Sequence, residues 1–259
     1  PQPGLLLPNR GIVSIMEDKS FQTGIFEEMP FEEYQQAQGL NQSTLKQIFR
    51  PRNYYNPHGV LIGNAGHCLL LEPERFEQDY QRLAPGISQR KLKKLEAKED
   101  LCEEPRPTLL PTNVWDALMN AQKAVNLHPQ ASWMLENSLK EVSLFWEAPE
   151  HNLRCKGRLD LLCPEKAFIA DLKFSYRTIS EANTQWHYAF QAAWYRQGIH
   201  KLTGEWLPFY LIFVERNTPY RVVVAELEKE TLEVGDRLLQ ESLVEYEAYA
   251  APPEFDDPA

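Results

Sequence analysis

The spacing of apolar residues along the chain predicts a sheet flanked by helices. In residues 114–125, apolar side chains recur at intervals of three and four, which is typical of an amphipathic helix. Further helices are predicted at 41–50, 60–72, about 181–201 and 228–249. Runs of apolar and β-branched residues predict strands at about 141–147, 153–162, 167–174, 206–215 and 220–227. This succession of strands and helices indicates an α/β fold with a mixed central sheet flanked by helices.

Proline, capping residues and composition mark the boundaries of these elements. Asn41 or Ser43 can cap the first helix and Pro51 can end it, while Pro73 is expected just past the end of the second. The length of 259 residues suits one α/β domain, which we place at 24–259. Residues 1–23 show no clear period and predict an extended arm. Residues 84–111, rich in charge and proline, predict a mobile insertion.

Two of the predicted strands carry an acidic residue inside an apolar run. Asp160 stands between two leucines, and Asp171 stands between an alanine and a leucine. A carboxylate buried there without a partner would be costly, whereas carboxylates that converge from adjacent strands suit a hard divalent cation. Lys173 lies two residues after Asp171 and therefore on the same face of its strand. The set predicts a metal-dependent phosphodiesterase rather than an ion pair on a solvated strand, which the apolar neighbours disfavour.

Two more residues are candidates for this centre, each with a structural alternative. Glu141 opens a strand and could bind metal or simply lie at a solvated strand end. His67 lies on a helix, where a lone histidine is more often a satisfied core residue than a ligand. Gly63 and Gly66 precede it and would let this helix approach the sheet or DNA closely.

The order of these motifs resembles that of a known nuclease family. Asp160 followed by D-L-K at 171–173 is similar to the core of the PD-(D/E)xK nucleases, although leucine stands at 159 where that core usually has proline. G-N-A-G-H at 63–67 and Q-A-A-W-Y at 191–195 resemble the G-x-x-x-H and Q-x-x-x-Y elements of the RecB-like branch. Within that branch the chain resembles the RecE-type exonucleases of phage recombination systems. This resemblance runs from G-I-F-E-E-M-P-F-E-E-Y near residue 24, through H-C-L-L-L-E-P-E-R-F at 67–76, to the C-terminal helix.

The resemblance implies a role for each matching position of the centre. Asp160 and Asp171 would be shared ligands of Mg²⁺, or of Mn²⁺ in its place, and the carbonyl of Leu172 would be a further ligand. His67 and Glu141 would bind metal directly or through water. The lysine at 173 would orient the attacking water or offset charge on the phosphorane.

Other positions would contact DNA by the same resemblance. Gln191 and Tyr195 lie one helical turn apart and would order the site or touch the DNA backbone, with ordinary packing as the alternative. In the related lambda-type exonucleases, a serine and basic residues near the N-terminus hold the 5′-phosphate. Ser43, Lys46 and Arg50 match that role here, and a plain polar helix face is the alternative.

The net charge of −10 argues against a protein covered in positive potential. An enzyme that must release a polyanion can still be acidic overall if its lysines and arginines gather in one channel. The candidate DNA-binding cluster consists of Arg90, Lys91, Lys93 and Lys94. A solvated helix face is the alternative, although Arg90 and Lys94 would repel each other at a spacing of four.

Cysteine usage and hydropathy narrow the class of protein further. Four cysteines in a chain of this length do not make a disulfide scaffold. No C-x-x-C pair exists and no cysteine follows Cys163, so the iron–sulfur cluster of some RecB-like nucleases is not expected. Cys68, Cys102, Cys155 and Cys163 are expected to be small buried side chains. No apolar run approaches the roughly 20 residues that span a bilayer, and no secretory signal is evident, which predicts a cytoplasmic protein without membrane association.

Together, the residues and the resemblance predict a Mg²⁺-dependent exodeoxyribonuclease. By resemblance it would degrade double-stranded DNA from the 5′ end and leave a 3′ single strand for an annealing partner protein. A toroidal homo-oligomer, such as a tetramer, is implied in the same way. One alternative is another RecB-like nuclease that acts on single strands or as an endonuclease. A second is a catalytically silent DNA-binding or assembly module, against which the complete acid–acid–lysine set argues.

Overall fold

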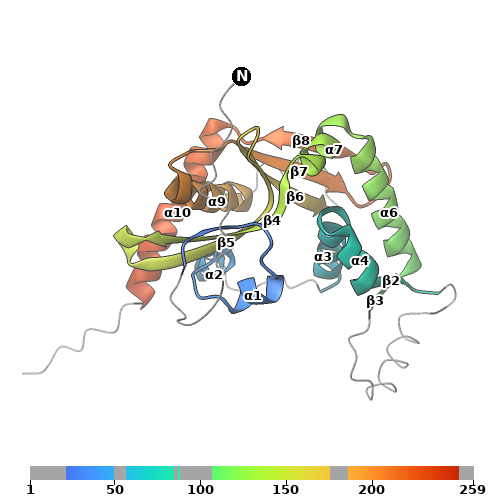
Figure 1. Cartoon of the computed structure of the whole chain (residues 1–259), viewed down its shortest axis with the longest axis horizontal. Coiled ribbons are helices and arrows are strands. Elements are labelled where there is room, and N and C mark those ends of the chain that lie inside the picture. The colour runs from blue at the N-terminus through green and yellow to red at the C-terminus, as the bar shows by residue number, and fades with distance from the viewer. Residues whose placement is uncertain (1–21, 50–56, 85–86, 88–106, 176–185, 251–259) are drawn as a thin grey trace, which may run out of the picture.

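A six-stranded sheet forms the centre of the molecule (Figure 1). The computed structural model describes residues 22–49, 57–84, 87, 107–175 and 186–250. The strands, in their order across the sheet, are β1 (Gly24–Phe26), β4 (Leu139–Ala148), β5 (Leu153–Cys163), β6 (Phe168–Ser175), β7 (Phe209–Glu215) and β8 (Val222–Glu226). Helices cover both faces of this mixed sheet, which confirms the fold class that the sequence predicts.

Neighbouring strands run antiparallel except for β6 and β7, which are parallel. β4 and β5 form a hairpin whose turn is the 3-10 helix Pro149–His151 followed by Asn152 at φ 49°. Asparagine adopts this left-handed backbone readily because its short polar side chain can bond locally. Parallel neighbours need a long crossover, and between β6 and β7 the crossover includes helix α9 (Trp186–Thr203).

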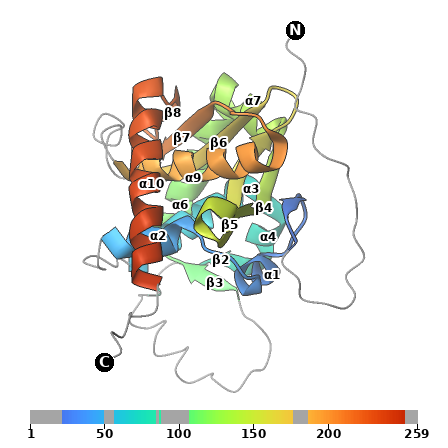
Figure 2. The ribbon, with the colours of Figure 1, turned by 90° about the vertical axis from the view of Figure 1, so that its left-hand side faces the viewer.

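One face of the sheet is covered by α9 and α10 (Lys229–Ala250), which cross each other in Figure 2. Trp146 of β4 and Trp194 of α9 are both buried, and their ring centroids lie 5.0 Å apart. A Cβ atom at Gly198 would lie 2.9 Å from the Trp146 ring, so only glycine lets α9 come this close. This packing holds α9 firmly against the strands that carry the acids.

The other face is covered by α3 (Pro57–Leu71), α6 (Thr112–Leu127) and α7 (Pro129–Glu136). Leu70, Val125 and Met134 from these helices pack against Leu172 and Ile212 of the sheet. After α3, α4 (Pro73–Asp79) leads into a small parallel sheet of β2 (Tyr80–Arg82) and β3 (Thr108–Leu110).

The sequence predicts a close approach of α3 at Gly63 and Gly66, and the structure shows one at Gly66. A Cβ atom at Gly66 would lie 2.7 Å from the Phe174 ring of β6, so a larger residue would push the helix away from the sheet. At Gly63 no described atom lies within 4 Å of such a Cβ. The close approach of this helix to the sheet therefore depends on Gly66.

The longer predicted elements are confirmed. The first helix is α2 (Gln42–Phe49), and Asn41 caps it because its Oδ1 accepts from the backbone N–H of Thr44 at 2.9 Å. Pro73 lies past the end of α3 and begins α4. Proline suits the first position of a helix because the backbone N–H there has no partner within the helix. The three acid- and lysine-bearing strands, the helix at 112–127 and the closing helix all form within a few residues of their predicted bounds.

Several short elements were not predicted. Those with no counterpart in the prediction are β1, α1 (Phe31–Gln36), α4, β2, β3 and α7. Strands of three residues and helices of one or two turns contain too few side chains to establish a period. Thr108–Leu110, near the end of the insertion predicted at 84–111, forms β3. Residues 85–86 and 88–106 of that insertion, and residues 1–21 of the arm predicted at 1–23, lie outside the described residues.

Two further predictions concern the burial of the cysteines and membrane-spanning segments. Cys68, Cys155 and Cys163 are buried, as predicted, and Cys102 lies outside the described residues. Burial raises the pKa of the Cys155 thiol to about 12 and that of Cys68 to about 11, so both thiols stay protonated near neutral pH. No helix in the described part of the chain is both long and apolar enough to cross a membrane.

Candidate active site

The candidate site lies where strands β5 and β6 separate. Their last paired residues are Leu161 and Ala170, so Asp160 and Asp171 are the first residues beyond the ladder. Beyond the ladder, a side chain provides the hydrogen bond between the two strands: Oδ2 of Asp160 accepts from the backbone N–H of Leu172 at 2.7 Å. The separation of the two strands thus brings both predicted acids to one point, which we name the fork.

Asp171 is held from two directions. Its side chain is 3% exposed, its Oδ1 accepts from Nε2 of Gln191 at 2.7 Å, and its Oδ2 pairs with the Lys173 ammonium. Gln191 comes from α9, so the helix packed on this face fixes the carboxylate. Burial alone would lower the pKa of Lys173, but the carboxylates of Asp171 and Asp160 outweigh it and raise that pKa. Lys173 is therefore a cation beside the two acids.

His67 reaches the fork from the opposite side, on α3. Its Nδ1 lies 3.5 Å from Oδ2 of Asp160, and its ring hydrogen-bonds to the backbone of Leu172. Burial and the nearby Lys173 charge lower the pKa of His67 to about 4. The imidazole is therefore neutral at physiological pH, which is the form that can bind a metal ion.

Glu141 faces the fork from β4. Lys140 pairs with Leu161 and Val142 with Leu159, which leaves Glu141 opposite Asp160 in the register. Its backbone has φ 53°, a left-handed conformation that is costly for glutamate and that often marks functional sites. Burial raises the pKa of Glu141, and its bond to an arginine offsets part of that rise.

That arginine, Arg158, is a site residue that the sequence analysis missed. Its Nε donates to Oε2 of Glu141 at 2.6 Å, and its Nη1 donates to Oγ of Ser143 at 2.8 Å and to the carbonyl of Met29 at 2.9 Å. The guanidinium also lies over the ring of Tyr34. Its place two residues before Asp160, on the same face of β5, was a signal that could have identified it.

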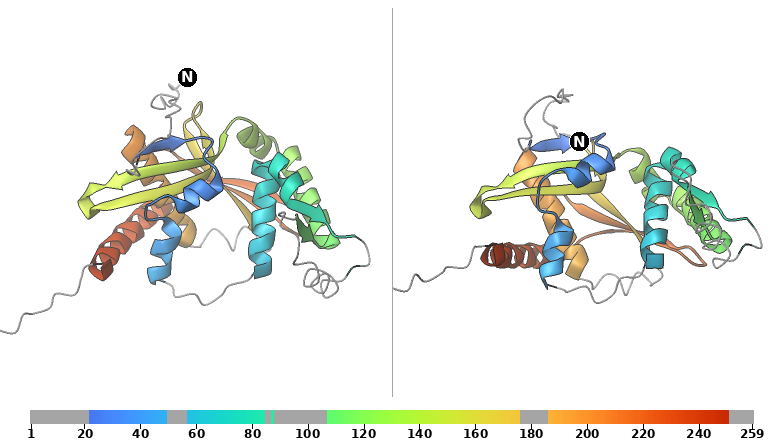
Figure 3. Two further views of the ribbon diagram at one scale, coloured as in Figure 1. Left: turned by 60° about the horizontal axis from the view of Figure 1, so that its bottom comes forward. Right: turned by 90° about the horizontal axis from the view of Figure 1, so that it is seen from below.

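Helix α2 supplies a second lysine near the fork. Lys46 lies over the Phe190 ring at 5.8 Å, and burial together with the Lys173 charge lowers its pKa to about 7. Nε2 of Gln42, on the same helix, donates to the Tyr195 hydroxyl at 3.1 Å. Figure 3 shows α2 and α3 on either side of the strands that meet at the fork. Lys46 and His67 thus approach the acids from two different helices.

The other predicted DNA contacts are partly buried, partly exposed and partly outside the described residues. Tyr195 is 7% exposed and packs against Gly157, so its hydroxyl serves to hold α2 through Gln42. Ser43 is exposed on α2, and its hydroxyl donates to Oδ1 of Asn41 at 2.7 Å. Arg50 and the cluster at 90–94 lie outside the described residues.

The electrostatics of the fork favour a cation. Burial, followed by the negative charge of Asp171, raises the pKa of Asp160 well above its usual range. Burial, followed by the charges of the same two carboxylates, raises the pKa of the Tyr195 hydroxyl well above its usual range. Asp160 and Asp171 are thus two neighbouring carboxylates with one ammonium, that of Lys173, beside them. A further cation would neutralise the remaining negative charge.

The fold and the acid–acid–lysine fork define a domain of the PD-(D/E)xK type. Over residues 29–253 the chain matches the family described as a PDDEXK-like domain of unknown function (DUF3799), and it belongs to that family. No curated protein matches the chain.

Solved structures support the fold. The chain is similar to a candidate exonuclease from Eubacterium rectale, with 14% sequence identity and a TM-score of 0.58, covering 90% of this chain and 91% of that one. The structure of SSO0001 aligns over 89% of this chain and 91% of its own at 15% identity, but its TM-score of 0.31 is too low to indicate a shared fold. At these identities the first likeness shows a shared fold.

Enzymes of this fold commonly use a divalent metal, and the residues at the fork fit one. In the described part of the chain, no three His, Cys, Asp or Glu side chains already converge as a ready metal site. The acids are turned instead to the Leu172 N–H and to Lys173. Oδ2 of Asp171 is nevertheless buried, with the Lys173 ammonium as its partner. Two buried carboxylate oxygen donors of this kind suit Mg²⁺.

Proposed function

We propose that this protein is a metal-dependent nuclease whose active centre is the fork. The observation that carries the proposal is the meeting of Asp160, Asp171 and Lys173 at the point where β5 and β6 separate. The meeting of these three side chains is not a local property of the sequence, because it depends on the register between β5 and β6. A second buried carboxylate beside the Asp171–Lys173 pair would be costly as a purely structural feature, because one ammonium does not compensate two buried charges.

The residues of the fork divide the work of phosphodiester hydrolysis among them. Asp160, Asp171 and the carbonyl of Leu172 would hold Mg²⁺, or Mn²⁺ in its place, and a bound ion supplies a more acidic water and neutralises charge. Lys173 places a fixed ammonium beside the scissile phosphate, where negative charge grows in the transition state. Gln191 keeps Asp171 in position, and the neutral imidazole of His67 lies beside Asp160.

We further propose that the substrate is double-stranded DNA and that degradation begins at its 5′ end. The motif order of the RecE-type exonucleases supports this, together with Lys46, which reaches the fork from α2 as a 5′-phosphate contact would. The similar Eubacterium rectale structure is of a candidate exonuclease. In this role the protein would leave 3′ single strands for an annealing partner and would act as a ring of identical subunits, such as a tetramer.

Digestion of end-labelled DNA tests the proposal. Duplexes labelled at the 5′ or the 3′ end are incubated with Mg²⁺ or with EDTA, beside a closed circular single strand. We expect early release of the 5′ label as mononucleotides, only with Mg²⁺, and an intact circle. Prior release of the 3′ label would overturn the polarity, and cutting of the circle would indicate an endonuclease. The absence of any cleavage, with DNA still bound, would overturn the nuclease proposal itself.

A further inference from the structure

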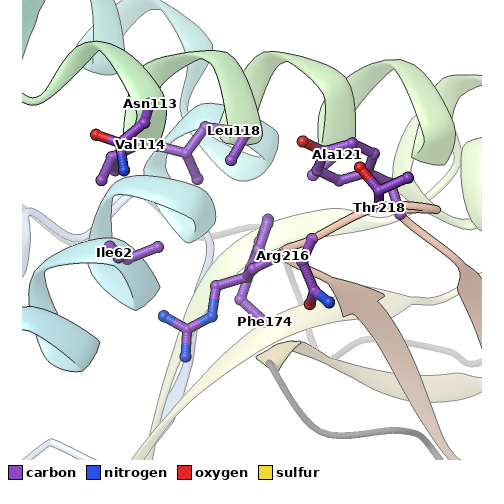
Figure 4. Close-up of a pocket in the computed structure, with 11 residues that line it drawn as sticks. Ile62, Asn113, Val114, Leu118, Ala121, Phe174, Arg216 and Thr218 are labelled. Atoms are coloured by element: carbon purple, nitrogen blue, oxygen red, sulfur yellow. The ribbon is translucent and has the colours of Figure 1, made fainter.

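A pocket of about 270 Å³ lies beside the fork, between α3, α6 and the turn that joins β7 to β8. Small-molecule sites usually measure roughly 300 to 1,000 Å³, so this one has room for a single base but not for a duplex. Figure 4 shows α6 forming one wall with Val114, Leu118 and Ala121, opposite Phe174 and Arg216.

Phe174 separates this pocket from the fork. It follows Lys173 directly in β6, so its side chain projects to the other face of the sheet. Its ring lines the pocket, touches Gly66 of α3 and lies 6.2 Å from the ring of His67, measured between centroids. A single aromatic side chain therefore borders both the pocket and the residues around Asp160.

The lining of the pocket suits a nucleoside. Its inner part is apolar, with Ile62, Leu118 and the Phe174 ring, and such surfaces stack or pack on a flat base. Its rim is polar and includes Asn113, Asn217 and Thr218, whose amides and hydroxyl can bond base edges or sugar.

The charge of the pocket points to an anionic ligand. Of the residues that line it, all within the described part of the chain, Arg216 alone is charged, and no acid faces in. Nη1 of Arg216 donates to the carbonyl of Gly59 at 3.4 Å, which directs the guanidinium toward α3, as Figure 4 shows. In a chain with a net charge of −10, a cavity whose one charge is positive is suited to a phosphate-bearing group.

We propose that this pocket receives one unpaired nucleoside of the DNA strand whose phosphate lies at the fork. This inference rests on the proposed nuclease function and adds a subsite to it. The base would lie against Phe174, and Arg216 would approach the adjoining phosphate. Because only an unpaired base can enter, the pocket would favour DNA ends at which the strand has already left its complement.

An abasic scan tests the subsite without relying on cleavage. Duplexes with a short single-stranded end carry one abasic nucleotide, moved position by position along that end, and their affinity is measured in Ca²⁺. Ala117→Phe fills the pocket from α6. The matched control is Ala124→Phe, the same change at another half-buried position of the same helix that does not line the pocket. A second variant, Asn113→Ala with Thr218→Ala, alters only exposed rim residues.

We expect one abasic position to weaken binding to the unaltered protein by about tenfold, toward the lower end of what a stacked base contributes. That position effect should disappear in Ala117→Phe, shrink in the rim variant and persist in Ala124→Phe. A flat scan in the unaltered protein, or the same profile in Ala117→Phe, would overturn the subsite. Mg²⁺-dependent cleavage with a flat scan would leave the nuclease proposal standing alone. A position-specific scan without cleavage would keep the subsite and overturn the nuclease proposal.

Discussion

At the scale of single residues, a specific donor stabilises each of the two acids of the fork and the glutamate that faces it. Asp160 accepts from the Leu172 N–H, Asp171 from the Gln191 amide and the Lys173 ammonium, and Glu141 from Arg158. Buried carboxylates without such donors would be strongly unfavourable. These pairings make separate predictions for metal binding, catalysis and stability.

Replacing either acid of the fork should abolish cleavage. Asp160→Asn and Asp171→Asn each remove an oxygen ligand, and we expect a rate loss above about 1,000-fold because a metal contributes several kcal/mol to the transition state. Mg²⁺ should raise the melting temperature of the unaltered protein but not that of either variant. Glu147→Gln, an exposed change on β4, is the control. Retained Mg²⁺-dependent cleavage in Asp171→Asn would contradict this assignment.

The role of Lys173 separates catalysis from binding. Lys173→Ala should lower the single-turnover rate by about 100-fold, since the ammonium acts on transition-state charge, and change duplex affinity much less. Lys140→Ala, which removes a lysine from β4, two strands away from β6 in the sheet, should leave both quantities unchanged. If Lys173→Ala instead weakened affinity at an unchanged rate, Lys173 would be a phosphate contact and not part of the chemistry.

The pairing of Arg158 with Glu141 should be visible in stability. Both side chains are largely buried, at 11% and 20% exposure, so Arg158→Ala leaves a carboxylate without its partner. We expect a loss of about 3 kcal/mol in the free energy of unfolding, the lower end for breaking a buried pair. Adding Glu141→Gln to that variant should recover part of the loss, because the uncompensated charge is gone. Urea titration of the two single variants and the double variant measures this, and purely additive effects would contradict the pairing.

At the scale of elements, helices α2 and α3 are attached to the sheet by a few specific contacts. α2 starts at the Asn41 cap and is held to α9 by the bond between Gln42 and Tyr195. α3 approaches β6 because position 66 is glycine. These attachments decide where Lys46 and His67 lie relative to the acids.

The position of α2 predicts a preference for phosphorylated ends. We expect the unaltered protein to digest 5′-phosphorylated duplexes about tenfold faster than 5′-hydroxyl duplexes, as one charge-assisted contact of 1.5–3 kcal/mol allows. Lys46→Ala should remove that preference, while Lys123→Ala, an exposed lysine on α6, should keep it. Equal rates on both ends in the unaltered protein would show that α2 holds no terminal phosphate.

At the scale of the whole molecule, a protein with net charge −10 must bind DNA through local positive charge. The described residues place two lysines at the fork and one arginine beside the pocket. The basic cluster at 90–94, outside the described residues, is predicted to contribute the rest.

The salt dependence of duplex binding tests this cluster. Replacing all four of its residues, Arg90, Lys91, Lys93 and Lys94, with alanine should reduce the slope of log affinity against log salt by up to about 3.6, or 0.9 for each phosphate contact. The rate of cleavage of bound DNA should not change, because the cluster is separate in sequence from the fork residues. Affinity is measured over a salt series in Ca²⁺.

A charge-matched control separates this contact from a general effect of net charge. It replaces four exposed basic residues on α6, the β5–β6 turn and α10: Lys123, Lys166, Lys229 and Arg237. This control should leave the slope near that of the unaltered protein. Equal slopes in the cluster variant and the unaltered protein would assign the cluster to a solvated surface.

The sequence by itself determined the longer elements and the identity of the acids. Strand and helix periods are local properties, so the strands around Asp160 and Asp171 and the helix that begins at Asn41 could be predicted from neighbouring residues. An acid within an apolar run is also a local signal. The three-residue strands and short helices lacked enough residues to show a period.

The tertiary structure alone decided which side chains meet. The register of β5 and β6 ends at Leu161 and Ala170, and only this makes the two aspartates converge. Glu141 pairs with Arg158 across a hairpin, and Tyr195 reaches Gln42 from a helix far along the chain. Such contacts depend on how strands and helices pack over long sequence separations, and no local period carries that information. The pocket beside Phe174 arises in the same way, from elements that the chain brings together only on folding.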